Sequence, residues 1–158
     1  MAELTTLKTH SGAITKLSDV EVSSKVTSAM DQTYTFHYKV THAVPLGGYF
    51  SILLSADHGN EATGANGVRI SNAETVKRNC FLVTDTGKDK GLECNTGKTA
   101  DGRPFVNITC SRAGFGETGT AKGASFKFKI QGLTNPRMRH YVSYFKLYTL
   151  DQKLRYID

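Results

Sequence analysis

The sequence predicts an all-β protein, an antiparallel β-sandwich with an immunoglobulin-like or jelly-roll-like arrangement of about eight to ten short strands. Three observations support this class. Apolar and polar residues alternate in several stretches, as they do when a strand has one buried and one exposed face. Gly, Asn and Pro separate these stretches. No sustained 3.6-residue pattern marks a helix, so a sandwich is favoured, with an open barrel as the alternative.

The clearest strand is residues 124–130, which we place at the centre of the sandwich. Its inward positions are Phe126, Phe128 and Ile130, alternating with Ser and Lys. We expect this strand to end at Gly132 and Asn135-Pro136, because Pro lacks a hydrogen-bond donor for the sheet. Residues 141–149 follow and are rich in the aromatic and β-branched residues that strands favour.

The other strands are assigned from the same alternation. They are expected at residues 4–8, 20–26, 32–40, 49–54, 80–84, 91–94 and 105–110, with short additions near 67–70 and 151–158. Residues 55–67 form a long polar loop, of a length that is often functional or mobile.

Length and composition predict one soluble globular domain spanning residues 1–158. Lys and Arg number 20 against 14 Asp and Glu, which gives a formal net charge of +6. Such a charge permits binding to nucleic acid or to an anionic surface. The basic residues are scattered, however, so a solvated basic surface is the favoured interpretation and nucleic-acid binding is not expected.

Three cysteines, Cys80, Cys94 and Cys110, allow at most one internal disulfide. Hairpins folded about Gly87 and Gly102 would place the three sulfurs in one row across adjacent antiparallel strands, within disulfide distance. We favour a Cys80–Cys94 bridge, with Cys94–Cys110 as the alternative; Cys110 is then free or the alternative partner. Three reduced thiols in a cytosolic core remain the other possibility.

The segment Asn107-Ile-Thr109 matches the pattern for N-glycosylation. Its neighbours Val106 and Ile108 face inward on this assignment, so Asn107 faces outward, where a sugar could be attached.

No catalytic, metal or cofactor site is predicted. The five histidines share no metal-ligand spacing, and no nucleophile or phosphate-binding motif is present. The loops 57–60 and 85–91 contain Asp and Asn but do not match a calcium-ligand series, so both are expected to be turns. We therefore expect a protein that is not an enzyme.

The strand aromatics have two interpretations. Beside Lys39, Lys127, Lys129 and Lys146 they would form a stacking platform for bases or sugars. We favour a sandwich core with tyrosines at its rim.

No apolar run approaches the roughly 20 residues of a membrane helix, so membrane insertion is not expected. The first residues lack the basic start and apolar core of a signal peptide. The chain is then either intracellular or a piece of a longer secreted protein.

Two stretches carry a resemblance to a known group of proteins. Residues 33–36, the turn Val44-Pro-Leu-Gly-Gly48 and the strand after it resemble the opening of tandem Ig-like β-sandwich modules in very large surface proteins of unicellular eukaryotes and bacteria. Residues 130–136 and 145–149 resemble their closing half, so that the similarity spans roughly residues 32–157. Such modules occur in tandem and serve as stalks, coats or adhesins.

The resulting hypothesis is a non-enzymatic structural or adhesive module of an extracellular or cell-surface protein, part of a larger repeat assembly. Its expected partners are neighbouring modules or other proteins, with glycans as a further possibility. The alternative is a basic nucleic-acid-binding or virion/coat-like β protein, which the charge balance motivates.

Overall fold

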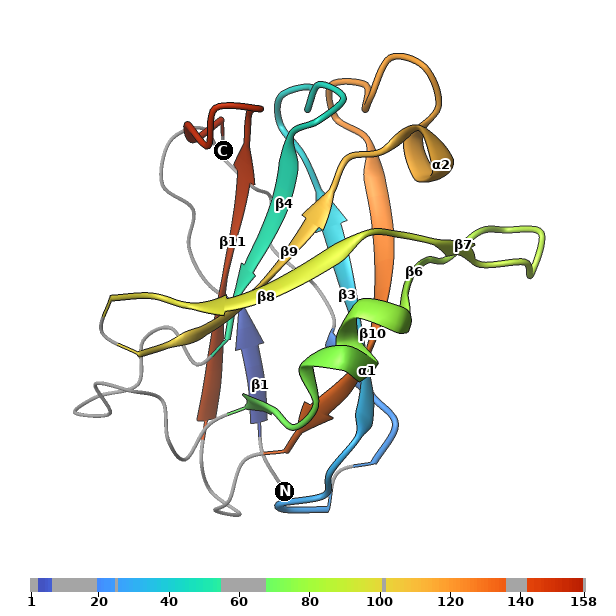
Figure 1. Ribbon diagram of the computed structural model, residues 1–158. Coiled ribbons are helices and arrows are strands. Elements are labelled where there is room, and N and C mark those ends of the chain that lie inside the picture. The colour runs from blue at the N-terminus through green and yellow to red at the C-terminus, as the bar shows by residue number, and fades with distance from the viewer. Residues whose placement is uncertain are drawn as a thin grey trace.

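The computed structural model describes residues 3–6, 20–24, 26–54, 68–100, 102–135 and 142–157; for 3–6, 142–144 and 146 it describes the backbone alone. Two β-sheets lie face to face and enclose a hydrophobic core (Figure 1). The predicted β-sandwich is therefore confirmed. The loop expected at residues 55–67 lies outside the described residues, and the single domain over residues 1–158 stays a prediction.

The first sheet has five strands. Their order across the sheet is β1 (Glu3–Thr6), β11 (Val142–Leu150), β4 (Tyr49–Leu53), β9 (Pro104–Thr109) and β8 (Cys94–Lys98). β1 runs parallel to β11, and the other three pairings are antiparallel.

The second sheet has six strands and contains the strand assigned to the centre of the sandwich. Its order is β2 (Val20–Val22), β3 (Gln32–Lys39), β10 (Ser125–Thr134), β6 (Cys80–Leu82) and β7 (Lys90–Gly91), with β5 (Arg69–Ile70) pairing to the end of β10. The described ranges thus hold eleven strands rather than eight to ten, because two of them are only two residues long.

The core is built from the inward positions of both sheets. Phe36 of β3 meets Phe145 of β11 edge to face, with ring centroids 5.2 Å apart. Phe50 of β4 lies 5.1 Å from Phe128 of β10. Such contacts across the sandwich favour edge-to-face or tilted rings over face-to-face stacking. The alternation in the sequence therefore predicts correctly which residues fill the core.

Two tyrosines expected at the rim are instead fully buried. Tyr34 and Tyr38 of β3 are each 1% exposed. The Tyr34 hydroxyl donates to Asn135 Oδ1 at 2.7 Å, and the Tyr38 hydroxyl reaches the carbonyl oxygens of Tyr148 and Ser51 in the opposite sheet. A buried hydroxyl needs such partners, since an unpaired one costs about 1–3 kcal/mol.

The prediction that Gly132 ends the central strand is wrong. β10 continues to Thr134 through a bulge, where the register with β3 shifts between Gln131 and Leu133. Gly132 has φ 102°, a conformation that side-chain-bearing residues rarely adopt. Asn135 follows the last residue of the strand, as expected.

Two short helices are also present, although none was expected. α1 (Ala73–Arg78) has six residues and a single buried side chain, Val76. α2 (Arg112–Phe115) has four residues. Both are too short to show a helical period in the sequence. The predicted tail strand is likewise absent from the described residues, where Tyr156 makes an isolated bridge to Leu150.

Candidate functional site

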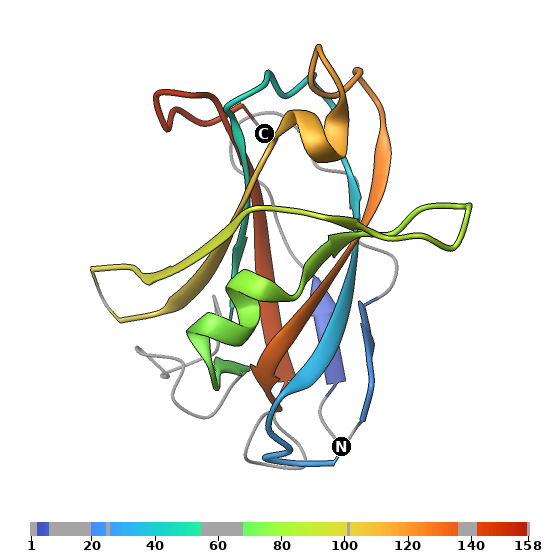
Figure 2. The ribbon, with the colours of Figure 1, turned by 45° about the vertical axis from the view of Figure 1, so that its right-hand side comes forward.

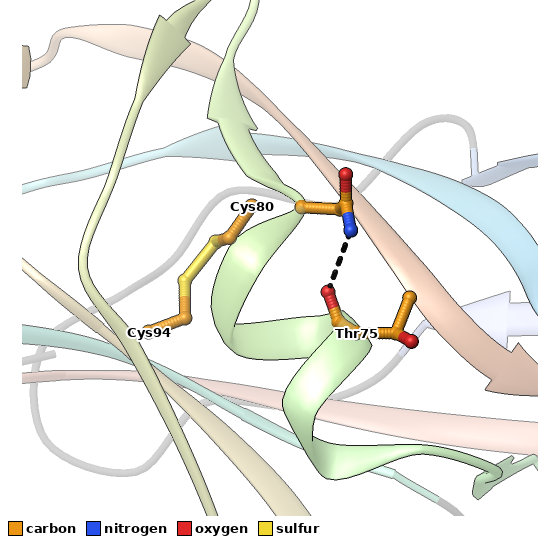
Figure 3. Close-up of a disulfide and its surroundings, with 4 residues drawn as sticks. Thr75, Cys80 and Cys94 are labelled. Atoms are coloured by element: carbon orange, nitrogen blue, oxygen red, sulfur yellow. Dashed lines mark hydrogen bonds between the residues drawn. A yellow bond between two sulfur atoms is a disulfide. The ribbon is translucent and has the colours of Figure 1, made fainter.

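A disulfide joins the two sheets at one edge of the sandwich. Cys80 is the first residue of β6 in the six-stranded sheet, and Cys94 is the first residue of β8 in the five-stranded sheet. Their Cα atoms are 6.3 Å apart, and both side chains are buried (Figure 3). The predicted bridge is confirmed, but it connects sheets rather than neighbouring strands of one sheet.

The predicted row of three cysteines is therefore wrong. In the β6–β7 hairpin, Phe81 pairs with Gly91, and the Leu92 N–H donates to the Cys80 carbonyl. In the β8–β9 hairpin, Cys94 pairs with Ile108 and not with Cys110. Each register differs from the expected one by two residues, which keeps every side chain on its predicted face.

The chain changes sheets between these two hairpins, at Leu92 and Glu93. Figure 2 shows the β6–β7 and β8–β9 hairpins extending in opposite directions from this point. The buried Leu92 packs under α2, where a side chain on Gly114 would come within 2.4 Å of it. The sequence analysis missed this change of sheet. The change places Cys94 in the five-stranded sheet, facing Cys80 of the six-stranded sheet.

Helix α1 lies beside the disulfide (Figure 3) and is capped at both ends. At its start, Asn72 Oδ1 accepts from the Thr75 N–H at 3.2 Å, an interaction typical of helix N-caps. At its end, the Asn79 N–H and side-chain amide both donate to the Thr75 carbonyl, at 2.9 and 3.1 Å. Cys80 follows at once, so the helix fixes the direction in which the chain enters β6.

Cys110 is free and fully buried beyond the end of β9. Its thiol donates to the Val44 carbonyl at 3.7 Å. Burial raises the pKa of this thiol to about 11, a shift that a backbone hydrogen bond at Thr120 opposes. A protonated, buried thiol is a poor nucleophile, so Cys110 acts as a core residue.

Asn107 lies on the outer face of the five-stranded sheet, between Ser51 of β4 and Asn95 of β8. Its neighbours Val106 and Ile108 are fully buried, whereas Asn107 is half-buried. It lines a groove of about 280 Å³ with Phe105, Tyr148 and other residues. Asn107 Oδ1 is buried there without a hydrogen-bond partner. The glycosylation pattern thus lies in an uncharged, partly aromatic groove.

The tail after β11 forms one wall of this groove through Leu154 and Tyr156, which are about 60% exposed. Its turn is held by Asp151, whose pKa is lowered mainly because its carboxylate accepts the Arg155 N–H. Asp151 also pairs with the Arg155 guanidinium at 2.8 Å. The hydrogen bonds of this turn therefore account for the lowered pKa of Asp151.

The outer face of the six-stranded sheet is basic. Lys39 of β3 and Lys127 of β10 are exposed, and His37 lies opposite Lys127 across the strand pair. Lys129 pairs with Asp89 in the β6–β7 loop at 2.9 Å. His37, Lys39 and Lys127 border a groove of about 570 Å³, which the sequence analysis did not predict. Alternation alone places Lys39 and Lys127 on one face, but their proximity depends on the pairing of β3 with β10.

The aromatic stacking platform considered from the sequence is wrong for five of the described strand aromatics, whereas Phe126 and Tyr148 are only partly buried. Tyr34, Phe36, Tyr38, Phe128 and Phe145 are all buried. The four in β3 and β10 point into the core, on the face opposite Lys39 and Lys127, because alternate residues of a strand point to opposite sides; Phe145 points into the core from the other sheet.

Within the described ranges, no group of three or more His, Cys, Asp or Glu residues could hold a metal ion. Residues 83–89 connect β6 to β7, and the Thr84 hydroxyl donates to the Lys88 carbonyl there; the last two residues of the turn expected at 85–91 form β7. Residues 57–60 lie outside the described part of the chain. No helix among the described residues is long and apolar enough to cross a membrane.

The fold and these surfaces define a disulfide-braced β-sandwich with one basic and one uncharged outer groove. Comparison with protein-family models, curated proteins and solved structures gave no significant match.

Proposed function

We propose that this chain is a non-enzymatic structural or adhesive module of an extracellular or cell-surface protein. The Cys80–Cys94 disulfide carries the proposal. Stable disulfides form in oxidising compartments and are rare in the cytosol. A bridge between two sheets resists separation of the layers, which suits a module that bears load or stands in a chain of modules.

The proposal extends to the kind of protein in which the module resides. The resemblance carried by residues 33–36 and 44–48 and by the closing strands suggests tandem Ig-like modules of large surface proteins. Neighbouring modules, other proteins and glycans are then the partners.

The redox state of the cysteines in the producing organism tests the compartment. Living cells would be treated with a membrane-permeant alkylating reagent before lysis, and the peptides mapped without reduction. We expect a Cys80–Cys94 linked peptide, with Cys110 modified only after denaturation. Alkylated Cys80 and Cys94 would contradict an extracellular module, and Cys110, alkylated after denaturation, serves as the control for detecting a free thiol in the same molecules.

We also propose that Asn107 carries an N-linked glycan in the secreted protein. Its groove supports this, because the first sugar would lie against the rings of Tyr148 and Tyr156, which are 5.2 Å apart. Secretion from a eukaryotic host should give a mass that falls on treatment with an endoglycosidase. Thr109→Ser keeps the acceptor pattern and should retain the glycan, whereas Thr109→Ala should lose it. An unmodified Thr109→Ser protein and an unmodified wild type would exclude the site.

A nucleic-acid-binding or coat-like role is the second candidate, favoured by the net charge of +6 and the exposed Lys39 and Lys127. Titration of a labelled oligonucleotide at low and physiological salt distinguishes the two. Tight binding with a steep salt dependence would favour this role, since phosphate contacts release counterions. Weak binding at both salts would favour the module.

A further inference from the structure

The groove on the outer face of the six-stranded sheet has the size and polarity of a small-ligand site. Its volume of about 570 Å³ falls in the range of roughly 300–1,000 Å³ that is usual for ligand pockets. Three segments line it: the end of β3, the start of β10 and the loop that follows β6. The polar side chains among the lining residues are His37, Lys39, Thr84, Asp85, Ser125 and Lys127.

The cations of this groove are available to a ligand. Lys39 and Lys127 are exposed, and neither is joined to another described residue by an ion pair. Lys129, two residues beyond Lys127, is instead held by Asp89 at 2.9 Å. The groove therefore keeps two free ammonium groups beside a lysine that is already neutralised.

His37 adds an unsatisfied polar atom to the same lining. Its Nε2 is buried and has no hydrogen-bond partner among the residues that the structure describes. A buried nitrogen without a partner is destabilising. His37 faces Lys127 across the β3–β10 pair, so its imidazole lies beside one of the two exposed lysines of the groove.

The remaining lining residues favour a sugar over a nucleic acid. Thr84, Ser125 and Asp85 supply hydroxyl and carboxylate groups, which suit the hydroxyls of a saccharide. Of the aromatic members, Tyr38 is fully buried, and the partly buried Phe126 ring is stacked on Phe128, so neither ring stands in the groove as a platform for a base.

We propose that this groove binds an anionic saccharide, a sugar that carries sulfate or carboxylate groups. Lys39 and Lys127 pair with the anionic groups, and Asp85, Thr84 and Ser125 take the sugar hydroxyls. The choice of a saccharide rests in part on the extracellular role proposed above, where such glycans are found.

The test compares two double variants that remove the same charge. Lys39→Gln with Lys127→Gln alters the groove, whereas Lys98→Gln with Lys153→Gln removes two exposed lysines from β8 and from the turn after β11. Each protein would be titrated calorimetrically with a heparin hexasaccharide, its desulfated counterpart and a single-stranded oligonucleotide of equal charge, at physiological salt.

We expect the wild type to bind the sulfated hexasaccharide most tightly of the three. The groove variant should bind it about tenfold more weakly, which corresponds to about 1.4 kcal/mol. The control variant should change by less than about twofold, because single exposed charges contribute little. Thermal unfolding of both variants would confirm that the fold is intact.

Three results would overturn the proposal. Equal losses in both variants would mean that the binding is due to net charge alone. Tighter binding of the oligonucleotide, lost with Lys39 and Lys127, would make the groove a nucleic-acid site. No binding of the sulfated probe to a wild-type protein with an intact disulfide would reject the saccharide site and leave the extracellular assignment, which thiol mapping tests separately.

Discussion

Cys80 in the six-stranded sheet and Cys94 in the five-stranded sheet are covalently joined, with their Cα atoms 6.3 Å apart. The bridge closes a loop between residues separated by 14 positions, which contains the β6–β7 hairpin and the passage from one sheet to the other. It therefore limits how far the unfolded chain can separate these elements, and it holds the edge of the sandwich beside α1.

Replacing both bridged cysteines by alanine should lower the free energy of unfolding by about 3 kcal/mol, the value expected for closing a loop of about 15 residues. Urea unfolding with and without reductant would measure this. The reduced wild type should approach the stability of the double variant, which itself should not respond to reductant. A wild type whose midpoint is unchanged by full reduction would contradict a stabilising role.

Gly132 connects the central strand to helix α1. Its carbonyl accepts the Ser71 N–H at 2.9 Å and the Ser71 hydroxyl at 2.8 Å. A methyl group at Gly132 would lie 3.0 Å from the Asn72 carbonyl and 3.0 Å from Val76, in a backbone with φ 102°. The glycine thus allows both the bulge and the close approach of the helix.

Gly132→Ala should therefore destabilise the protein by about 1–3 kcal/mol, the usual cost of a strained backbone conformation. Gly91→Ala is the matched control, because nothing lies within 4 Å of a methyl group there and its φ is not positive. Chemical unfolding of the two variants gives the comparison. Equal stabilities of the two variants would mean that α1 moves away without cost.

Tyr34 links the core to the segment before β3 through Asn135. It donates to Asn135 Oδ1, and the Asn135 amide donates to the Ser24 and Val26 carbonyls at 2.6 and 2.8 Å. Tyr34→Phe should cost about 1–3 kcal/mol, because the buried Oδ1 loses its partner.

Tyr49→Phe provides the control for the loss of a hydroxyl, since Tyr49 lies half-buried on the outer face of β4. It should change the free energy of unfolding by less than about 0.5 kcal/mol. Unfolding by urea would measure both variants. If Tyr34→Phe were as stable as Tyr49→Phe, the Tyr34–Asn135 bond would not contribute to the fold.

The strands could be predicted because their signal is local. Residues 32–40 and 124–130 alternate strictly, and the structure buries the apolar members of both. Alternation cannot reveal a two-residue shift in the pairing of a hairpin, because such a shift leaves every side chain on the same face of the sheet. For this reason the prediction that all three cysteines point inward is correct, whereas the prediction of which cysteines lie opposite one another is wrong.

The change of sheet after β7 could not be predicted from neighbouring residues. Leu92 and Glu93 look like the continuation of a hairpin, and only the packing of Leu92 under α2 and the pairing of β8 with β9 show where the chain goes. The basic groove was missed for a related reason. His37, Lys127 and Thr84 are distant in sequence, and they meet through pairings that depend on the whole sandwich.

Two buried acidic groups should make the protein less stable at alkaline pH. Burial raises the pKa of the Cys110 thiol to about 11 and raises the pKa of the Tyr34 phenol above its ordinary value. In each case the unfolded chain releases the proton at a lower pH than the folded protein does. Above the ordinary pKa the folded state therefore binds more protons, and the free energy of unfolding falls as the pH rises.

The Cys110 contribution should be complete below about pH 8.5, where the unfolded thiol is still protonated. It should fall by about 2 kcal/mol at pH 10, and the loss should level off above the folded pKa of about 11. The loss from Tyr34 should begin near pH 10, the ordinary pKa of a phenol. Urea unfolding between pH 7 and pH 11 at constant ionic strength would measure both. Cys110→Ala should remove the fall that starts near pH 9, and Tyr34→Phe should reduce the later one. If Cys110→Ala lost stability with pH as steeply as the wild type, the thiol would titrate at the same pH in both states, and its burial would not be coupled to folding.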